Sequence, residues 1–580
     1  MNSFLYTTLN SYQNHPILFV FGLGNYIEKL FQNENLKFLV IFEDNEELIE
    51  NFINKKYIIS LLQSKKLFIF NVNTFNFDRA KELFLQQNFM FYSKIAEILK
   101  FKNSNSIQII QNYINKAIES IFNALQSSQE CEVYIEHFCK NLPKTLSHSS
   151  TKNFLSAHKA KQKYAIIVAS GPNLIKQLPL LKKIQNKVSI FCADGSFTIL
   201  HKYGIKPDYV FCIERDVING KKDKVIGSWN FFDNNFGDFD RDILFIFSDT
   251  INPKTIKLIE KNNRNYMITL STNSFCTSFG FDEFGYCDLS FNSVANLAYN
   301  FAVSLCYTNI ILIGQDLAFG KDGNSHPKDF LHGTNLDSSR YKHIKTIAYG
   351  GQKKVYTHAA WLLYKEKYEY DINLNKHIVK TYNATEGGAR IEGAIEKPFK
   401  ELCDKIIKEN TIKNTKKLTL PSKHSIYTNL QKALNHFKTI NQTSKNFLDD
   451  SKKIIEKIQN VSLQIDSLPK NLSLEESLRL IDFNQISILQ KEIKLYKENI
   501  YKNKFFSTIL LSYMYANECN FIHLECLNTN ITIKNMINQL SFVINHKRHI
   551  EEMVKLIQFQ HSIINQTITD IQELISKDFS

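Results

Sequence analysis

Polar and glycine-bearing segments follow five apolar runs in the middle of the sequence. They are Ser170-Gly171-Pro172-Asn173, Asp194-Gly195-Ser196, Glu214-Arg215-Asp216, Ser248-Asp249 and Gly314-Gln315-Asp316. The preceding runs, such as AIIV and NIILI, are apolar throughout, which is typical of parallel strands covered on both faces. Because the carboxyl ends of parallel strands meet at one edge of the sheet, where ligands bind, we expect one shared rim. Hydrogen-bonding groups along a whole rim favour a nucleotide pocket over a set of solvated loop ends.

The segment after the first run has the features of an anion site. Gly171 leaves no side chain in the way of a phosphate, and Pro172 suits the first position of a helix because its missing N–H costs nothing there. The free amides of Asn173 and Leu174 then point outward at the positive end of the helix dipole. A Gly-Pro turn also joins a strand to a helix without any ligand, so this segment alone leaves both interpretations open.

The segment NATEGGARIEG, residues 383–393, is a second candidate for ligand contact. Gly387 and Gly388 allow the backbone to wrap closely around a ligand, while Thr385 and Glu386 offer polar contacts. The alternative is a strand followed by a tight bend, and we favour ligand contact. No DxD pair, HExxH motif or His/Cys cluster predicts a metal ligand set; Asp316 suits a magnesium ion held through water, but nothing requires one.

The distribution of glycine indicates which elements position these residues. Seventeen of the 19 glycines fall between Gly171 and Gly393, which divides the chain into residues 1–155, 156–400 and 401–580. The first part reads as three strands with helices and becomes helical from about residue 80, as over residues 80–100. The middle alternates strands with helices. The last part is glycine-free, with apolar residues at helical spacing, as at Leu430, Leu434 and Phe437. The fold class is therefore α/β: a central Rossmann-like parallel sheet domain, a small N-terminal α/β domain and a C-terminal helical bundle.

The N-terminal segment FGLG imitates a dinucleotide-binding fingerprint. Gly22 and Gly24 follow an apolar run, and Glu43 lies about twenty residues further on. The third glycine of the fingerprint is missing. We therefore interpret this part as a partner-binding or vestigial module and not as a second active site.

Composition narrows the class of protein. The formal net charge of +14 comes from dispersed lysines without a basic tract, which favours an acidic small substrate over nucleic acid. The ten cysteines include no CxxC pair, which indicates buried thiols in a reducing compartment. No apolar run approaches the roughly 20 residues of a membrane span, and no signal peptide is recognisable. These features predict a cytoplasmic protein.

Three motifs together resemble a known family. They are AIIVASGPNL with IFCADGSFTILHKYGIKPDYVFCIERD, then SVANLAYNFAVSLCYTNIILIGQDLAF, and then YNATEGGARIEGAI. They are similar to the motility-associated factor (Maf) glycosyltransferases over roughly residues 160–400. The first two are also similar to bacterial sialyltransferases that use CMP-activated sugars. The resemblance implies an enzyme that transfers a nonulosonic acid, such as pseudaminic or legionaminic acid, from its CMP derivative to serine or threonine hydroxyls of flagellin.

The resemblance also assigns roles to residues. Asp194 stands where the sialyltransferases have an asparagine that contacts CMP, and Glu214-Arg215-Asp216 departs further from their pattern. The phosphodiester and carboxylate of the donor would suit Arg215 and Arg390. The implied substrate-binding set is Ser170, Gly171, Pro172, Asn173, Asp194, Gly195, Ser196, Glu214, Arg215, Gln315, Thr385, Gly387, Gly388 and Arg390.

The acceptor hydroxyl needs a base, and three histidines lie near the long loop after Asp316. They are His326, His332 and His358. The sialyltransferases use a histidine after the equivalent loop, which favours His326 or His332. Asp316 and Glu386 are carboxylate alternatives.

Two other functions fit parts of the sequence. Archaeal pterin pyrophosphokinases share the signature of the central domain, and such an enzyme would use ATP with magnesium. A non-enzymatic flagellin-binding scaffold or chaperone would use the helical bundle, but would not need a polar rim on every strand. The C-terminal helices serve either flagellin docking or self-association as a homo-oligomer, and the sequence leaves this choice open.

Overall fold

The computed structural model describes most of the chain. The described residues are 16–24, 26–32, 36–85, 97–100, 106–124, 128–159, 163–215, 227–272, 274–287, 293–336, 343–409, 413, 418–526 and 532–579. Contacts group the chain into two compact units, one from Met1–Cys131 with Gln442–His561 and the other from Glu132–Asn441 with Ser562–Ser580. We call them unit 1 and unit 2. The division into three domains at residues 155 and 400 stays a prediction.

Unit 2 is built on a nine-stranded sheet, all of whose paired strands run parallel. The strand order is β10-β9-β8-β7-β6-β5-β11-β14-β15. The strands are β5 (Tyr164–Val168), β6 (Ser189–Ala193), β7 (Tyr209–Cys212), β8 (Leu244–Ser248), β9 (Asn265–Ser271), β10 (Tyr286–Cys287), β11 (Asn309–Ile313), β14 (Lys380–Asn383) and β15 (Ile395–Glu396). The five apolar runs of the middle segment are β5, β6, β7, β8 and β11. This confirms the predicted parallel α/β sheet.

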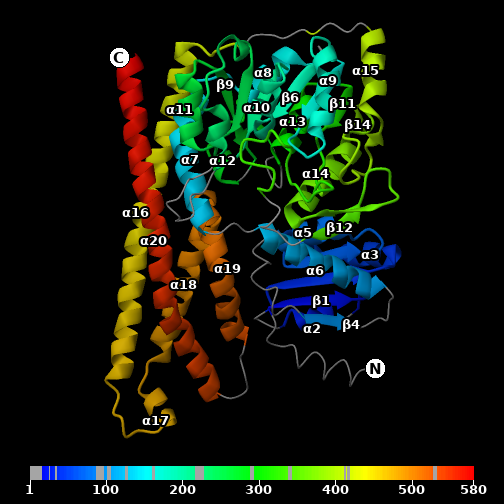
Figure 1. Ribbon diagram of the computed structural model, residues 1–580. Helices are drawn as coiled ribbons and strands as arrows, with labels where there is room; N and C mark the ends of the chain where they lie inside the picture. Colours follow the sequence, from blue (N-terminus) through cyan, green and yellow to red (C-terminus); the bar gives the residue numbers. More distant parts are fainter. Residues whose placement is uncertain are drawn as a thin grey trace. The chain divides into compact units, whose positions relative to one another are not determined.

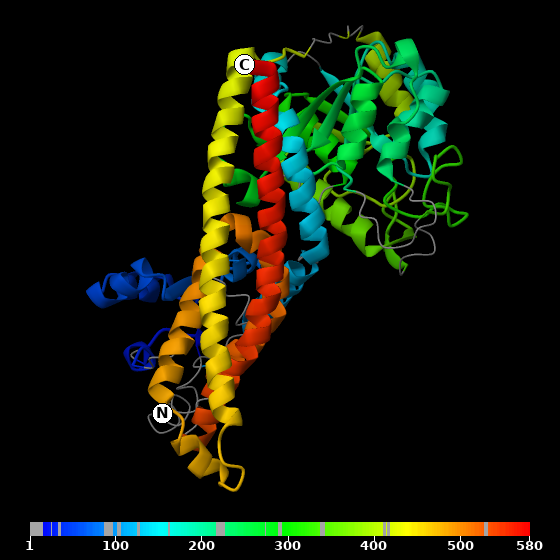
Figure 2. The same cartoon turned by 90° about the vertical axis from the view of Figure 1, so that its left-hand side faces the viewer.

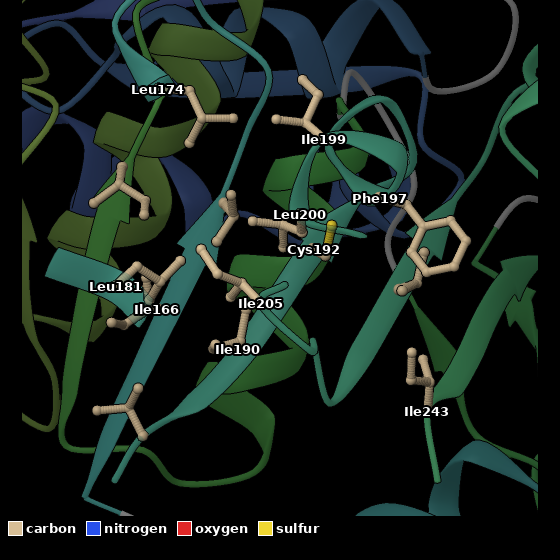
Figure 3. Packing of buried hydrophobic residues seen from close by; sticks show 14 of the residues in the cluster. Ile166, Leu174, Leu181, Ile190, Cys192, Phe197, Ile199, Leu200, Ile205 and Ile243 are labelled. Atoms are coloured by element: carbon tan, nitrogen blue, oxygen red, sulfur yellow. The ribbon is translucent and has the colours of Figure 1, made fainter. Parts of the chain in front are cut away.

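Helices cover both faces of this sheet, which explains why its strands are apolar on both sides. Ile166 packs into one core together with α9 (Leu174–Ile184), α10 (Asp194–Lys202), α11 (Pro253–Lys261) and α15 (Phe399–Lys408). Figure 3 shows part of this core, with Leu181 of α9 beside Ile166. The next residue, Ile167, packs into the opposite core with α8 (Thr151–His158), α13 (Val294–Ser304) and α14 (Ala359–Asn375). Because successive side chains of a strand point to opposite faces, each strand contributes side chains to two separate cores.

Smaller elements complete unit 2. They are α12 (Ser274–Thr277), the 3₁₀ helices Ser228–Phe232 and Gly237–Phe239, and an antiparallel hairpin of β12 (Ile344–Ile347) and β13 (Lys354–Thr357). Helix α7 (Ser128–Leu146) enters the unit from the amino-terminal side of the chain and lies near α11 and α12 in Figure 1.

Unit 1 contains a smaller parallel sheet, of order β3-β2-β1-β4. Its strands are β1 (Ile17–Phe21), β2 (Phe38–Glu43), β3 (Leu67–Asn71) and β4 (Glu97–Lys100), and its helices are α2 (Ile27–Leu30), α3 (Glu46–Ile53), α4 (Lys56–Gln63), α5 (Phe77–Leu85) and α6 (Ser106–Ala124). The helix predicted as far as residue 100 is wrong at its end, because Glu97–Lys100 pairs with β1. Without β4, the buried strand β1 would have no hydrogen-bonding partner on the side away from β2.

The C-terminal part of the chain is helical, as predicted, and its described residues after α15 form five helices. They are α16 (Lys423–Asp466), α17 (Leu474–Arg479), α18 (Phe483–Lys502), α19 (Lys504–Cys526) and α20 (Thr532–Phe579). The long helices α16 and α20 lie side by side in both Figure 1 and Figure 2. Tyr427 and Phe579 are in ring contact at 5.8 Å, and Ser444 Oγ lies 2.6 Å from His561 Nδ1. None of the helices among the described residues is both long and apolar enough to cross a bilayer.

Candidate functional site

The candidate site lies at the point where the strand order of the large sheet reverses. From β5 the chain proceeds outward through β6 to β10, and it then returns to place β11 on the other side of β5. The loops after β5 and β11 therefore diverge, and ligands bind in the crevice between such loops. A cavity of about 200 Å³ opens there. Of the predicted residues, eight line it: Ser170, Gly171, Pro172, Asp194, Glu214, Gln315, Asp316 and His326.

The predicted anion site at the start of α9 is occupied by the protein's own carboxylate. The backbone amide of Asn173 donates to Asp316 Oδ2 at 3.2 Å, and its side-chain amide donates to Asp316 Oδ1. The amide of Leu174 donates to the carbonyl of Gly171 at 3.1 Å. The prediction that these two amides are free is therefore wrong.

Asp316 is buried, with 2% of its surface exposed. Burial raises the pKa of its carboxyl to about 6, although the two hydrogen bonds from Asn173 favour the charged form. The ammonium of Lys176 donates to Asn173 Oδ1 at 2.7 Å and so helps to hold the Asn173 side chain against Asp316. The result is a carboxyl group that changes charge near neutral pH at the edge of the cavity.

Three predicted glycines pack around this pair and not around open space. A Cβ on Gly171 would lie 2.2 Å from Asp316 Oδ2, and one on Gly387 would lie 2.3 Å from Asn173 Nδ2. Gly388, at φ +72°, would place its Cβ 2.2 Å from the carbonyl oxygen of Asp316. The close wrap predicted for the two glycines of NATEGGARIEG exists, but it encloses the protein itself.

The other polar residues of NATEGGARIEG also serve the fold. Thr385 Oγ1 accepts from the amide of Gln315 at 3.1 Å, and Glu386 Oε1 accepts from the amide of Phe399, the first residue of α15. Arg390 pairs with Glu392 at 3.0 Å. No residue of this segment lines the cavity. The roles predicted for Thr385, Glu386 and Arg390 at the ligand are therefore not supported.

The ends of β6 and β7 contribute only in part. Asp194 lines the cavity, and its Oδ1 accepts from the amide of Gly195 at 2.7 Å. Ser196 is fully buried and lies outside the cavity. The carboxylate Glu214 is exposed and also lines the cavity, but the guanidinium of Arg215 stacks over the ring of Tyr134 at 5.8 Å. Asp216 lies outside the described residues.

Helix α7 closes the rim at β8. Asn141 Nδ2 donates to the carbonyls of Asp249 and Ile251 at 3.1 and 2.7 Å, and His137 Nδ1 lies 3.2 Å from the carbonyl of Thr250. The carboxylate of Asp249 accepts from the amide and hydroxyl of Ser271, both at 2.8 Å. Ser248 and Asp249 therefore belong to a buried contact, and the cavity is limited to the ends of β5, β6, β7 and β11.

Of the three histidines predicted as bases, His326 is the one that the fold brings to the cavity, where the carboxylate alternative Asp316 also lies. Its Nδ1 lies 2.9 Å from Ser325 Oγ, and its ring stacks on Phe330 at 3.9 Å between centroids. Burial lowers the pKa of His326 to about 4, with a further contribution from the charge of nearby His332. The imidazole is therefore neutral at pH 7, which is the form that a general base requires.

The other two histidines lie outside the cavity. His332 packs against Phe231 and Phe330 at 4.6 and 5.7 Å, and burial lowers its pKa. His358 precedes α14 and packs against Trp361 at 4.0 Å. Both therefore contribute to aromatic packing behind the site.

Sequence reasoning missed two parts of the lining. The first is the amino terminus of α13, from which Ser293, Val294 and Ala295 face the cavity. Ser293 caps this helix, since its hydroxyl accepts from the amide of Asn296 at 3.2 Å. The second is a pair of aromatic residues on α14, Trp361 and Tyr364. Their spacing of three residues on a helix was the available signal, since it places them on one face.

The fingerprint-like segment of unit 1 is filled by its own side chains. Glu43 is 2% exposed and accepts from the amides of Leu23, Asp44 and Asn45 at 2.8 to 3.0 Å. A Cβ on Gly24 would lie 2.7 Å from the ring of Tyr26, whose hydroxyl donates to the carbonyl of Gly22. The carboxylate of Glu43 therefore binds backbone amides of the protein, whereas the equivalent acid of a dinucleotide-binding domain binds a ribose.

No group of three or more His, Cys, Asp or Glu side chains that could hold a metal occurs within the described ranges.

Comparisons with known proteins place this fold. A family model described as 6-hydroxymethylpterin diphosphokinase MptE-like matches residues 136–322. Among solved structures, a MAf glycosyltransferase from Magnetospirillum magneticum AMB-1 is similar with a TM-score of 0.56 and 15% identity, over 100% of this chain and 87% of that chain. No curated protein matches the sequence. The resemblance to the Maf glycosyltransferases is thus confirmed in the fold.

Proposed function

We propose that this chain, which has the fold of a Maf glycosyltransferase, is itself a glycosyltransferase. Its donor is a CMP-activated nonulosonic acid, pseudaminic or legionaminic acid, and its acceptors are serine or threonine hydroxyls of flagellin in the cytoplasm. The observation that carries the proposal is the cavity at the strand switch point, which combines a neutral His326 with hydrogen-bonding side chains and an aromatic wall.

The lining suits the parts of such a donor. Trp361 and Tyr364 offer aromatic surface against which a base can stack. Val294 and Ala295, the first residues of α13, line the same cavity at the positive end of an eleven-residue helix. In this proposal the phosphate therefore binds at α13 and not at α9, where Asp316 accepts from the amide of Asn173 and Gly171 accepts from that of Leu174.

The charged side chains that line the cavity are acidic. Asp194, Glu214 and Asp316 line the cavity, while no lysine or arginine among the described residues does. A donor with a phosphodiester and a carboxylate would be repelled there unless a cation offset the charge. Magnesium is commonly held by one or two carboxylates together with substrate phosphates. We include Mg²⁺ on that ground, with Asp194 and Glu214 as its carboxylates.

In the transfer step, His326 accepts the proton of the acceptor hydroxyl at Nε2. The hydroxyl oxygen then forms the bond to the anomeric carbon of the sugar, while the bond from that carbon to the phosphate oxygen breaks. The electron pair of the broken bond leaves with CMP. The CMP phosphate is already a good leaving group, so stabilising its charge matters more than protonating it.

A thermal-shift experiment tests the nucleotide. We expect CMP with Mg²⁺ to raise the melting temperature, with a stabilisation of about 2.7 kcal/mol at 100 times the dissociation constant. Trp361→Ala should lose most of this shift. Trp229→Ala is the matched control, since Trp229 is buried beneath the ammonium of Lys254 and does not line the cavity.

The same experiment distinguishes the alternatives. A shift with ATP and none with CMP would replace the proposal by a pterin pyrophosphokinase, and no shift with either would favour a scaffold. The intact mass of flagellin co-expressed with this protein and a sugar-activating pathway then tests the transfer itself. An unmodified mass would contradict it.

A further inference from the structure

The loop that carries His326 is closed by contacts to one carbonyl. The amides of Ser325 and His326 donate to the carbonyl oxygen of Thr334 at 2.8 and 3.1 Å, and Ser325 Oγ lies 3.0 Å from the same oxygen. Ser325 is 2% exposed. The position of the His326 backbone is therefore fixed independently of the contacts of its side chain.

These contacts favour one direction for the hydrogen bond between serine and histidine. The hydroxyl of Ser325 has a single proton, and Thr334 offers it a carbonyl oxygen at 3.0 Å, which only accepts. With the proton donated there, Ser325 Oγ accepts from His326 Nδ1, 2.9 Å away, so that the imidazole proton lies on Nδ1 and the lone pair on Nε2. A hydroxyl that donates to Nδ1 instead would give the Nε2–H tautomer, and the test below distinguishes the two arrangements.

The plane of the ring is fixed separately. Phe330 stacks on His326 at 3.9 Å with an angle of 14° between the rings, and Phe231 contacts Phe330 at 5.6 Å between centroids. Gly195 makes room for Phe330, because a Cβ there would lie 2.8 Å from its ring. The predicted substrate-binding residue Gly195 thus serves the histidine loop.

We propose that Ser325 is a positioning residue, which fixes His326 in the Nδ1–H tautomer so that Nε2 receives the proton of the acceptor hydroxyl. The proposal rests on the proposed glycosyl transfer. When Nε2 takes that proton, His326 becomes an imidazolium, and its Nδ1–H still donates to Ser325 while the hydroxyl of Ser325 still donates to Thr334. The serine therefore supports the ring before and after the transfer without exchanging a proton itself.

The test uses the full chain labelled with ¹⁵N at histidine, with His326→Gln to assign the signals of His326. We expect the Nδ1–H tautomer in the wild-type protein. Ser325→Ala should convert a large fraction to the Nε2–H tautomer, and Ser325→Thr, which keeps the hydroxyl, should restore Nδ1–H. In transfer assays, Ser325→Ala should lower kcat by about 10- to 100-fold with the KM for the donor unchanged, as removal of an interaction used only in the transition state does.

Ser278→Ala is the matched control, because Ser278 Oγ also donates to a backbone carbonyl, that of Phe275 at 2.7 Å, outside the cavity. It should leave both the tautomer and kcat unchanged. An Nδ1–H signal that persists in Ser325→Ala would overturn the proposal, as would an unchanged kcat. The tautomer needs no substrate, so absence of transfer in the wild-type protein would reject the proposed function while the signals of His326 still decide the role of Ser325.

Discussion

Asp316 is the residue on which the chemistry of the cavity depends most. It forms two hydrogen bonds with Asn173 across 143 residues of sequence, and glycines on two segments make room for that contact. A buried carboxyl with a pKa of about 6 exists in both charge states near neutral pH. The charge state of Asp316 therefore affects both the charge of the cavity and the stability of the folded protein.

The raised pKa predicts how stability depends on pH. A carboxyl whose pKa is about 6 when folded and about 3.8 when unfolded stabilises the fold most below pH 3.8, and this contribution is lost as pH rises through 6. Relative to Asp316→Asn, we expect the wild-type protein to lose about 2 kcal/mol of unfolding free energy between pH 4.5 and pH 7.5.

Urea unfolding followed by tryptophan fluorescence checks this, since both tryptophans of the chain, Trp229 and Trp361, lie in unit 2 with Asp316. The pH-independent cost of the altered hydrogen bonds cancels in the comparison. A free-energy difference between the two proteins that stays constant with pH would contradict the raised pKa.

Helix α7 decides how much of the sheet edge is open. Its Tyr134, His137 and Asn141 lie on one side of the helix and contact the ends of β8 and β9. An open α/β sheet has a long rim, and a helix across part of it concentrates ligand binding at the switch point. At this scale α7 shapes the site without contributing a side chain to it.

Asn141→Ala should destabilise unit 2 by about 2 kcal/mol. The substitution leaves the buried carbonyls of Asp249 and Ile251 without their donor, and unsatisfied buried groups cost more than the bond itself contributes. Lys140→Ala on the same helix is the control. Its exposed ion pair with Glu136 should contribute less than about 1 kcal/mol. Equal effects of the two substitutions in urea unfolding would show that α7 is not held by Asn141.

The whole molecule combines two compact units that share two long helices, since α16 and α20 each contribute residues to both. Within unit 1, α18, α19 and α20 enclose a buried charged network. Lys497 Nζ lies 2.8 Å from Glu518 Oε2, and His549 Nε2 lies 3.0 Å from Glu518 Oε1. Burying these charges carries a desolvation penalty. Removal of one partner destabilises the fold further, because it leaves a buried charge without compensation.

Glu518→Ala should therefore lower the unfolding free energy by about 3–5 kcal/mol. Burial alone would raise the pKa of Glu518, but the Lys497 ammonium and His549 lower it to about 2, so the stabilisation is present above pH 4.5 and is lost as pH falls toward 2. Circular dichroism at 222 nm follows the helices. Glu552→Ala, which removes an exposed pair with Lys555, should change stability by less than about 1 kcal/mol. A loss for Glu518→Ala as small as that of the control would refute the argument.

Local patterns in the sequence determined much of the fold. Apolar runs, glycine placement and helical spacing are properties of neighbouring residues, and they identified β1 to β3, the five central strands and the helical C-terminal part. The strand β4 escaped because its four residues carry no pattern of their own and become a strand only by pairing with β1. The sequence also predicted a polar rim shared by the carboxyl ends of five strands, since parallel strands end at a common edge, and the candidate cavity lies at the ends of four of them, β5, β6, β7 and β11.

Only the tertiary structure decided which group fills each place at that edge. From the sequence we predict free amides at Asn173 and Leu174 and ligand contact at Gly387 and Gly388. Three histidines are candidate bases, with His326 or His332 favoured. Folding brings Asp316 to Asn173, packs the glycines on that pair, and leaves His326 alone of the three at the cavity. The physical reason is that hydrogen-bonding groups are satisfied by whatever lies nearest in space, and neighbours separated by more than a hundred residues carry no signal in local spacing.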